Sequence, residues 1–142
     1  MRFPNWVAPE IENGKLTKYN WLVQNKENLT LGDRTDIGAF TYINARHGVI
    51  LEDFVQIGSH CSIYSYSTID WKEGQVVLKR NCRIGTHSAV MPNVTIGKNT
   101  IVGAFSYVTK DIPENVVAFG VPARVVRQLT PGEIQKMEED TL

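Results

Sequence analysis

Aliphatic residues return every six positions along most of this chain of 142 residues. Two longer gaps divide the series into three runs: Leu31, Ile37 and Ile43; then Leu51, Ile57, Ile63 and Ile69; then Leu78, Ile84, Val90, Ile96, Val102 and Val108. An α-helix repeats at about 3.6 residues and a two-sided strand at about 2, so neither explains this period. The period predicts a parallel β-helix in which each hexapeptide supplies one short strand and one corner.

The residues between these anchors fit the same architecture. Four places after most anchors stands a small or β-branched residue: Thr35, Thr41, Val55, Cys61, Ser67, Cys82, Ser88, Val94, Thr100 and Ser106, with His47 as the exception. Glycine or asparagine often occupies the intervening positions, and both accept the left-handed backbone conformation that a tight corner needs. We expect the anchors and the small residues to point inward, with three hexapeptides forming one coil of about 18 residues.

The regular period is interrupted twice. Ile43 and Leu51 are eight residues apart, which predicts a bulge at a corner near Gly48. Between Ile69 and Leu78 the sequence WKEGQVV intervenes, with an exposed Trp71 expected. Interruptions of a solenoid become surface loops, and such loops often carry function.

The two ends of the chain lack the repeat. Residues 1–30 are expected to form an N-terminal cap, because the open end of a β-helix aggregates unless it is covered. Trp6 and Trp21 are interpreted as packing residues of this cap. Thr130, Pro131 and Glu133 match an N-cap, a first-turn proline and a capping-box acid, so a short helix is expected from Thr130. The chain is thus divided into a cap at 1–30, a β-helix at 31–111 and a C-terminal extension with a helix at 112–142, all within one domain.

Composition narrows the classes of function. Fifteen basic and fifteen acidic residues cancel, which argues against nucleic acid or an anionic membrane as the main partner. Cys61 and Cys82 fall on inward positions and are expected to be free core residues. No signal-like segment or apolar run of about 20 residues is evident, so we expect a cytoplasmic protein without membrane insertion.

The repeat and the sequence IGKNTIVGAFSYVTKDIPENVVAFGVPARVVRQL, from Ile96 to Leu129, resemble the left-handed β-helix acyltransferases of the hexapeptide-repeat family. The resemblance is to the sugar O- and N-acetyltransferases related to galactoside and maltose acetyltransferase, and it covers residues 31–129. It implies an all-β fold, namely a single-stranded left-handed parallel β-helix with an N-terminal cap segment and a short C-terminal helix. It also implies a homotrimer that uses acetyl-CoA as co-substrate and no metal.

The same resemblance implies acetyl transfer to a sugar or a nucleotide-linked amino sugar, for surface polysaccharide or lipopolysaccharide biosynthesis. A non-catalytic β-helix scaffold or binding protein is the main alternative, since fold does not fix function. A carbonic anhydrase-like protein of the γ class is a second alternative, because that site uses three histidines. The gaps of 13 and 27 residues between the three histidines here do not suit that metal site.

The resemblance assigns donor-binding positions. In the family, coenzyme A lies along the solenoid between neighbouring subunits, with its phosphates near the C-terminal coils. The matching positions of this chain are Thr86, Ala104, Thr109, Lys110, Arg124 and Arg127. Small side chains let the pantetheine arm approach the backbone, and the three cations neutralise phosphates through charge-assisted hydrogen bonds.

The acceptor and the catalytic base are expected near the interruptions. The acceptor contacts are predicted as Asn44, Arg46, Tyr64, Ser65 and Asp70. Acetyl transfer needs a base for the acceptor proton, and histidine, with an ordinary pKa of about 6.5, is the usual one. Galactoside acetyltransferase-like enzymes carry their catalytic histidine in a longer second loop, whereas here the loop has none and Thr68 falls near its place.

His60 is therefore predicted as the base, because it precedes a polar run that extends to Asp70. His87 is the alternative and His47 the third candidate. All three also fit as ordinary corner residues, because histidine accepts the left-handed backbone conformation better than most side chains.

Overall fold

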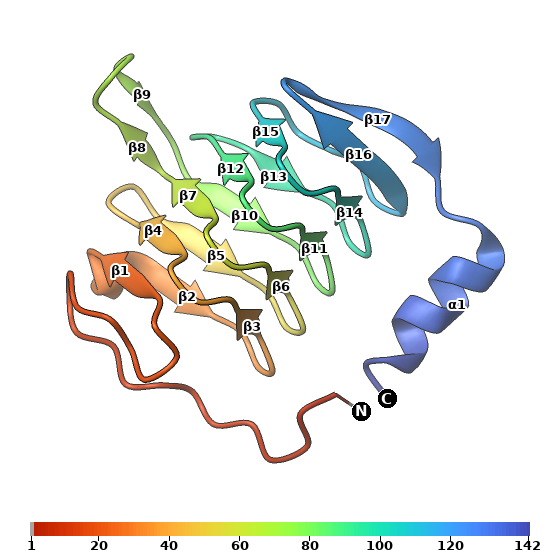
Figure 1. Ribbon diagram of the computed structural model, residues 1–142, viewed down its shortest axis with the longest axis horizontal. Helices are drawn as coiled ribbons and strands as arrows, with labels where there is room; N and C mark the ends of the chain where they lie inside the picture. Colours follow the sequence, from red (N-terminus) through yellow and green to blue (C-terminus); the bar gives the residue numbers. More distant parts are fainter. Residues whose placement is uncertain (1) are drawn as a thin grey trace.

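The computed structural model describes residues 2–142 as a three-sided solenoid of short parallel strands with one C-terminal helix (Figure 1). Sheet 1 has the order β1-β4-β7-β12-β15 and contains Leu22–Gln24, Tyr42–Asn44, Ser62–Tyr64, Ala89–Val90 and Tyr107–Val108. Sheet 2 has the order β2-β5-β10-β13 and contains Leu29–Leu31, Val49–Leu51, Val76–Leu78 and Thr95–Ile96. Sheet 3 has the order β3-β6-β11-β14-β16-β17 and contains Asp36–Ile37, Gln56–Ile57, Arg83–Ile84, Ile101–Val102, Val116–Gly120 and Ala123–Gln128. The predicted parallel β-helix is confirmed.

Strand registers show why the period is six. In sheet 3, Ile37 pairs with Ile57, Ile57 with Ile84, and Ile84 with Val102. Sheets 1 and 2 align their anchors in the same way, from Ile43 to Val108 and from Leu31 to Ile96. Each anchor therefore stacks on the anchor of the next coil, and nearly all of them are buried in one continuous core.

Ile69 is the anchor that the prediction placed wrongly. Its side chain is 91% exposed, because the chain leaves the solenoid after Ser65 and forms a hairpin from β8 (Tyr66–Ser67) and β9 (Lys72–Glu73). Leu78 takes the inward position in sheet 2 once the chain returns. Trp71 is 84% exposed in the turn of the same hairpin, as expected.

Three edges separate the sheets, and each has its own character. The histidine edge, between sheets 3 and 1, presents the corner residues Phe40, His60, His87 and Phe105, all with φ between 56° and 63°. The hairpin edge, between sheets 1 and 2, contains both interruptions of the repeat. The asparagine edge, between sheets 2 and 3, contains Asn81, Asn99 and Asn115.

The ends of the chain cover the solenoid. Met1 lies outside the described residues, and the segment expected to be the cap contains β1 and the 3₁₀ helix η1 (Lys26–Asn28). β1 pairs with β4, so this segment also supplies a strand of sheet 1. Trp21 is buried, and Trp6 is half-buried with its indole donating to Thr35 O (2.9 Å).

The predicted capping box is present at Thr130, and helix α1 runs over Pro131–Glu139. The helix lies against the asparagine edge, where Asn81 Nδ2 donates to Met137 O (2.9 Å). Its end is near the start of the chain, since Arg2 N donates to Asp140 O (3.1 Å; Figure 1). Cys61 and Cys82 are buried and free, as predicted. The helices within residues 2–142 are too short and too polar to span a bilayer.

The coils are in backbone contact at their corners, which makes Gly97 intolerant of a side chain. A Cβ on Gly97 would lie 2.3 Å from Glu114 N of the next coil, a contact that only backbone movement can relieve. We expect Gly97→Ala to lower the free energy of unfolding by about 2 kcal/mol, as overpacking does. Denaturant unfolding measures this change.

Gly132→Ala is the matched control. A Cβ on Gly132, in the first turn of α1, would have Thr130 Oγ1 at 4.0 Å as its nearest non-neighbouring atom. Alanine is the better helix former, so we expect unchanged or slightly higher stability. Equal losses in both variants would contradict the role of coil contact.

Candidate functional site

Four rings form a column along the histidine edge, in which Phe40 is tilted and the other three rings are stacked. Ring centroids are 5.4 Å apart from Phe40 to His60, 4.8 Å from His60 to His87 and 5.0 Å from His87 to Phe105. The two imidazoles are nearly parallel, with 5° between their planes. His87 Nδ1 is 2.8 Å from Thr86 Oγ1, and that hydroxyl donates to a backbone carbonyl. Among residues 2–142, neither imidazole forms an ion pair with a carboxylate.

Ser65 holds the turn between β4 and β5, which lies on the hairpin edge. This side chain is fully buried, and its hydroxyl donates to Asn44 O (2.7 Å) while it accepts from His47 N (2.9 Å). Asn44 Oδ1 in turn accepts from Arg46 N (3.2 Å). The Ser65 hydroxyl and the Asn44 carbonyl and side-chain oxygens therefore stabilise the turn that contains Arg46 and His47.

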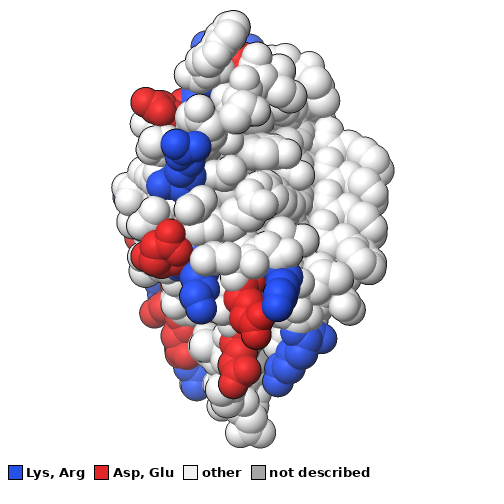
Figure 2. Space-filling view, turned by 90° about the vertical axis from the view of Figure 1, so that its left-hand side faces the viewer, with Lys and Arg blue, Asp and Glu red and all other residues white. Residues whose placement is uncertain are grey.

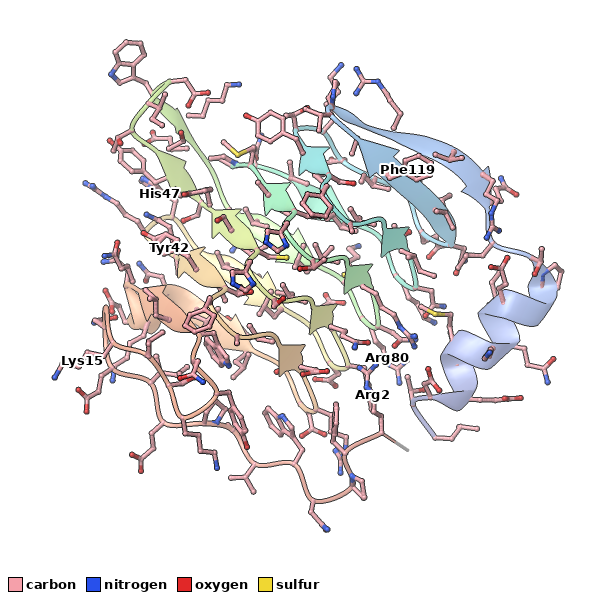
Figure 3. The ribbon with its side chains drawn as sticks, in the orientation of Figure 1. Arg2, Lys15, Tyr42, His47, Arg80 and Phe119 are labelled. Carbon is pink, nitrogen blue, oxygen red and sulfur yellow. The ribbon has the colours of Figure 1, made fainter. Side chains whose placement is uncertain are left out.

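The β8–β9 hairpin adds side chains from the second interruption. Tyr66 pairs with Glu73 across the hairpin, and its ring lies 4.7 Å from the Arg46 guanidinium and 5.2 Å from the His47 ring. His47 Nε2 is 3.2 Å from Glu73 Oε2. Figure 3 shows His47 at the foot of the hairpin. Two interruptions that lie far apart in the sequence thus form one cluster, and sequence reasoning missed this pairing.

The predicted acceptor residues come together only in part. Tyr64 pairs with Asn44 in sheet 1, beside Arg46, whereas Asp70 lies in the turn of the hairpin, 3.4 Å from Lys72 Nζ. His60 lies at the other end of β7, on the histidine edge. Within one chain, the predicted base and most of the predicted acceptor contacts are therefore on opposite edges of sheet 1.

The predicted donor residues divide in the same way. Thr86 and Ala104 lie on the histidine edge, whereas Thr109 and Lys110 follow β15 on the hairpin edge. Arg124 and Arg127 are exposed on β17. Within the described part of the chain, Lys110 and Arg124 have no ion pair. Arg127, by contrast, donates to both carboxylate oxygens of Glu133 (2.7 and 2.9 Å).

The placement of the histidines bears on the metal-site alternative. His60 and His87 share the histidine edge, while His47 is on the hairpin edge. The three side chains of one chain therefore do not converge on a single ion. No group of three or more potential metal ligands occurs in residues 2–142.

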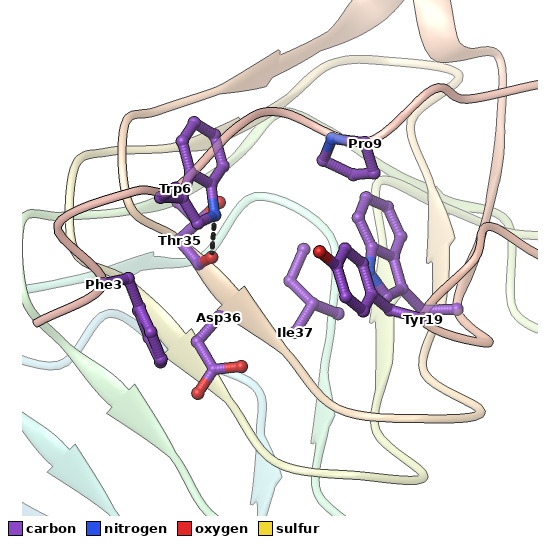
Figure 4. A pocket seen from close by; sticks show the side chains of 8 residues that line it. Phe3, Trp6, Pro9, Tyr19, Thr35, Asp36 and Ile37 are labelled. Atoms are coloured by element: carbon purple, nitrogen blue, oxygen red, sulfur yellow. Dashed lines mark hydrogen bonds between the residues drawn. The ribbon is translucent and has the colours of Figure 1, made fainter.

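A separate cavity of about 240 Å³ lies under the N-terminal segment (Figure 4). Its lining is mostly aromatic or apolar: Phe3, Trp6, Pro9, Tyr19, Trp21, Thr35, Asp36 and Ile37. None of the predicted site residues contributes to it. The predicted site residues on the two edges of sheet 1 and on β17 thus lie outside this cavity.

Charges on one side of the molecule are mixed in sign, and a broad neighbouring area has none (Figure 2). The side chains of sheet 1 that alternate with its inward anchors include Tyr42, Ser62, Tyr64, Ala89 and Tyr107, all uncharged. The solenoid therefore offers an uncharged sheet between its histidine and hairpin edges.

Comparison with known proteins places these features in a family context. The family model described as "Bacterial transferase hexapeptide (six repeats)" matches residues 75–110. A galactoside O-acetyltransferase of Lactococcus lactis subsp. lactis is 33% identical, over 73% of this chain and 58% of that protein. A putative colanic acid biosynthesis acetyltransferase of Escherichia coli is 36% identical, over 80% of this chain and 57% of that protein. The chain thus spans less than two thirds of the length of these relatives.

Solved structures agree with the fold. A galactoside acetyltransferase in complex with coenzyme A superimposes with a TM-score of 0.74 and 29% identity, over 80% of this chain and 62% of that one. A hexapeptide-repeat acetyltransferase from Vibrio cholerae, complexed with acetyl coenzyme A, gives a TM-score of 0.71 and 25% identity, over 78% and 65% of the two chains.

The Arg127–Glu133 pair predicts a pH dependence of stability. Two hydrogen bonds from Arg127, followed by the backbone N–H of Thr130, lower the pKa of Glu133 from 4.5 to about 2. An acid with a lowered folded-state pKa stabilises the fold above its unfolded pKa, and this contribution disappears as pH falls from about 4.5 towards 2. We expect the melting temperature of the wild type to exceed that of Glu133→Gln at pH 6 and to approach it near pH 2.

Circular dichroism melts from pH 6 to pH 2 measure this difference. Because the pair is exposed, the difference at pH 6 should also shrink in 1 M salt, which serves as the control. A difference that stays constant across the pH range would contradict the assignment.

Proposed function

This chain belongs to the hexapeptide-repeat family, and we propose that it transfers the acetyl group of acetyl-CoA to a sugar or an amino sugar, free or nucleotide-linked. The observation that carries the proposal is the superposition of 80% of the chain on a galactoside acetyltransferase in complex with coenzyme A. The likeness to the putative colanic acid acetyltransferase supports a role in surface polysaccharide or lipopolysaccharide biosynthesis.

The surface fits an elongated acyl donor that ends in phosphates. Thr86 and Ala104 are small side chains on consecutive coils, and a Cβ on Gly85 would already lie 2.5 Å from Ala104 N, so the backbones pack closely there. Lys110 and Arg124 are available as phosphate contacts, as charge-assisted hydrogen bonding requires. Arg127 would first have to break its ion pair with Glu133, so we expect it to contribute least to phosphate binding among the three predicted cations.

A complete donor site requires more than one copy of the chain. Thr86 and Ala104 on the histidine edge are separated from Thr109 and Lys110 by sheet 1. A cyclic trimer would place the histidine edge of one copy beside the hairpin edge of the next and so reunite the donor residues. The uncharged sheet 1 and the exposed rings of Phe40 and Phe105 support this packing.

Donor binding tests the function directly. We expect coenzyme A to raise the melting temperature, because a ligand of the native state stabilises it. Lys110→Ala and Arg124→Ala should each weaken coenzyme A binding about three- to tenfold, as measured by calorimetry, through loss of a phosphate contact of about 1 kcal/mol.

Pantetheine, which lacks the phosphates, is the control ligand, and its binding should be the same in wild type and both variants. No binding of coenzyme A at millimolar concentration would favour the non-catalytic scaffold instead.

The assembly predicts a mass in solution of about three chains by sedimentation. Phe105→Asn should weaken association, because it removes an exposed ring while asparagine still accepts the left-handed corner. A cooperative thermal melt of the Phe105→Asn variant would show that its chain is still folded. A wild type that sediments as a monomer at micromolar concentration would contradict the composite site.

A further inference from the structure

We propose that His47 is the base that accepts the acceptor proton and that Glu73 positions its imidazole. This inference rests on the proposed acetyl transfer and assigns its proton-transfer step. It differs from the sequence-based prediction, in which His60 is the base and His47 the third candidate.

A carboxylate lies beside the His47 imidazole. His47 Nε2 is 3.2 Å from Glu73 Oε2, whereas no carboxylate pairs with His60 or His87 within residues 2–142. A histidine base works best when one ring nitrogen is held by an acceptor and the other faces the substrate. His47 Nδ1 has no hydrogen-bond partner in the described residues, so it is the nitrogen left for the acceptor.

Several contacts fix the position of the His47 ring. The backbone of His47 donates to the buried Ser65 hydroxyl (2.9 Å), and the ring packs on Tyr66 (5.2 Å). Arg46 covers another part of the same tyrosine ring (4.7 Å). The side chain of His47 nevertheless remains 35% exposed, so a substrate can reach it. A fixed but accessible imidazole is what a proton transfer requires.

Within one chain, His47 lies on the same edge as most of the other predicted site residues. The hairpin edge also carries Asn44 and Arg46, predicted for the acceptor, and Lys110, predicted for the donor. His60 and His87 instead stack on each other in the histidine edge, with Phe40 tilted against His60 and Phe105 stacked on His87. That column explains the two histidines as left-handed corner residues that join one coil to the next.

The proton balance of the step is complete. As the acceptor oxygen or nitrogen attacks the thioester carbonyl carbon, His47 Nδ1 takes the proton from that atom. The tetrahedral intermediate then collapses, the carbon–sulfur bond breaks, and its electron pair leaves on sulfur. His47 returns the proton to the thiolate, so the products are the acetylated acceptor and the free thiol of coenzyme A. Glu73 remains a carboxylate throughout and holds the ring.

Steady-state kinetics on the full chain test the assignment. The rate is measured as thiol release from acetyl-CoA, with a panel of sugars and amino sugars as acceptors. We expect His47→Gln to lower kcat by about 10² to 10⁴-fold, the usual contribution of a general base. Its KM for acetyl-CoA and its melting temperature should stay close to wild type. Exogenous imidazole should restore part of the turnover of His47→Ala.

Glu73 requires its own readout because it acts through His47. Glu73→Gln should lower kcat at least about tenfold with little change in either KM, and Glu73→Asp should recover part of the loss. Glu12→Gln, which removes an exposed carboxylate on the N-terminal segment, is the matched control and should keep wild-type kinetics.

The outcomes separate the two proposals. Wild-type turnover that persists in His47→Gln, or that is lost in His60→Gln instead, would overturn the role of His47 and leave the acetyltransferase standing. A wild type that binds no acetyl-CoA and releases no thiol with any acceptor would overturn both.

Discussion

The contact of each coil with the next is the constraint on which this structure depends. Most strands are two or three residues long, and such short strands are stable only when several pair side by side. The hydrogen bonds between coils keep every anchor above the anchor below it, as in the line from Leu31 through Leu51 and Leu78 to Ile96. At corners such as Gly38, where a Cβ would lie 2.4 Å from Ser59 N, the backbones approach too closely for a side chain. The strand register between coils is therefore fixed, and the chain must resume the same register after any insertion.

The β8–β9 hairpin shows how this constraint brings the side chains of two loops together. The chain leaves sheet 1 at Ser65 and re-enters the solenoid in sheet 2 at Val76, which pairs with Val49 in the regular register. The insertion thus changes the surface without disturbing the core, and it lies on the edge where the preceding coil has its own bulge. Glu73 and Tyr66 from one interruption meet Arg46 and His47 from the other. A rigid solenoid that presents irregular loops in this way combines a fixed scaffold with a variable site.

The division of polar groups between two edges would give the proposed trimer a chemical purpose. In one chain, sheet 1 keeps the small residues of the histidine edge away from Lys110 on the hairpin edge. The sheet between them is uncharged, and its borders carry exposed aromatic rings. In the proposed trimer, rotation of the chain about a three-fold axis would bring the two unlike edges together. Substrate binding and subunit packing would then depend on the same surface.

The sequence by itself determined the solenoid, the inward anchors, the buried cysteines and the capped helix at Thr130, because each is encoded by a local pattern of a few residues. It misplaced Ile69, since a hexapeptide spacing persists for one unit after the chain has left the coil. Only the tertiary structure decided that His47 pairs with Glu73, 26 residues away, and that His60 stacks on His87. The physical reason is that the coils place residues side by side according to the length of each interruption, and the sequence records that length but not the path the loop takes.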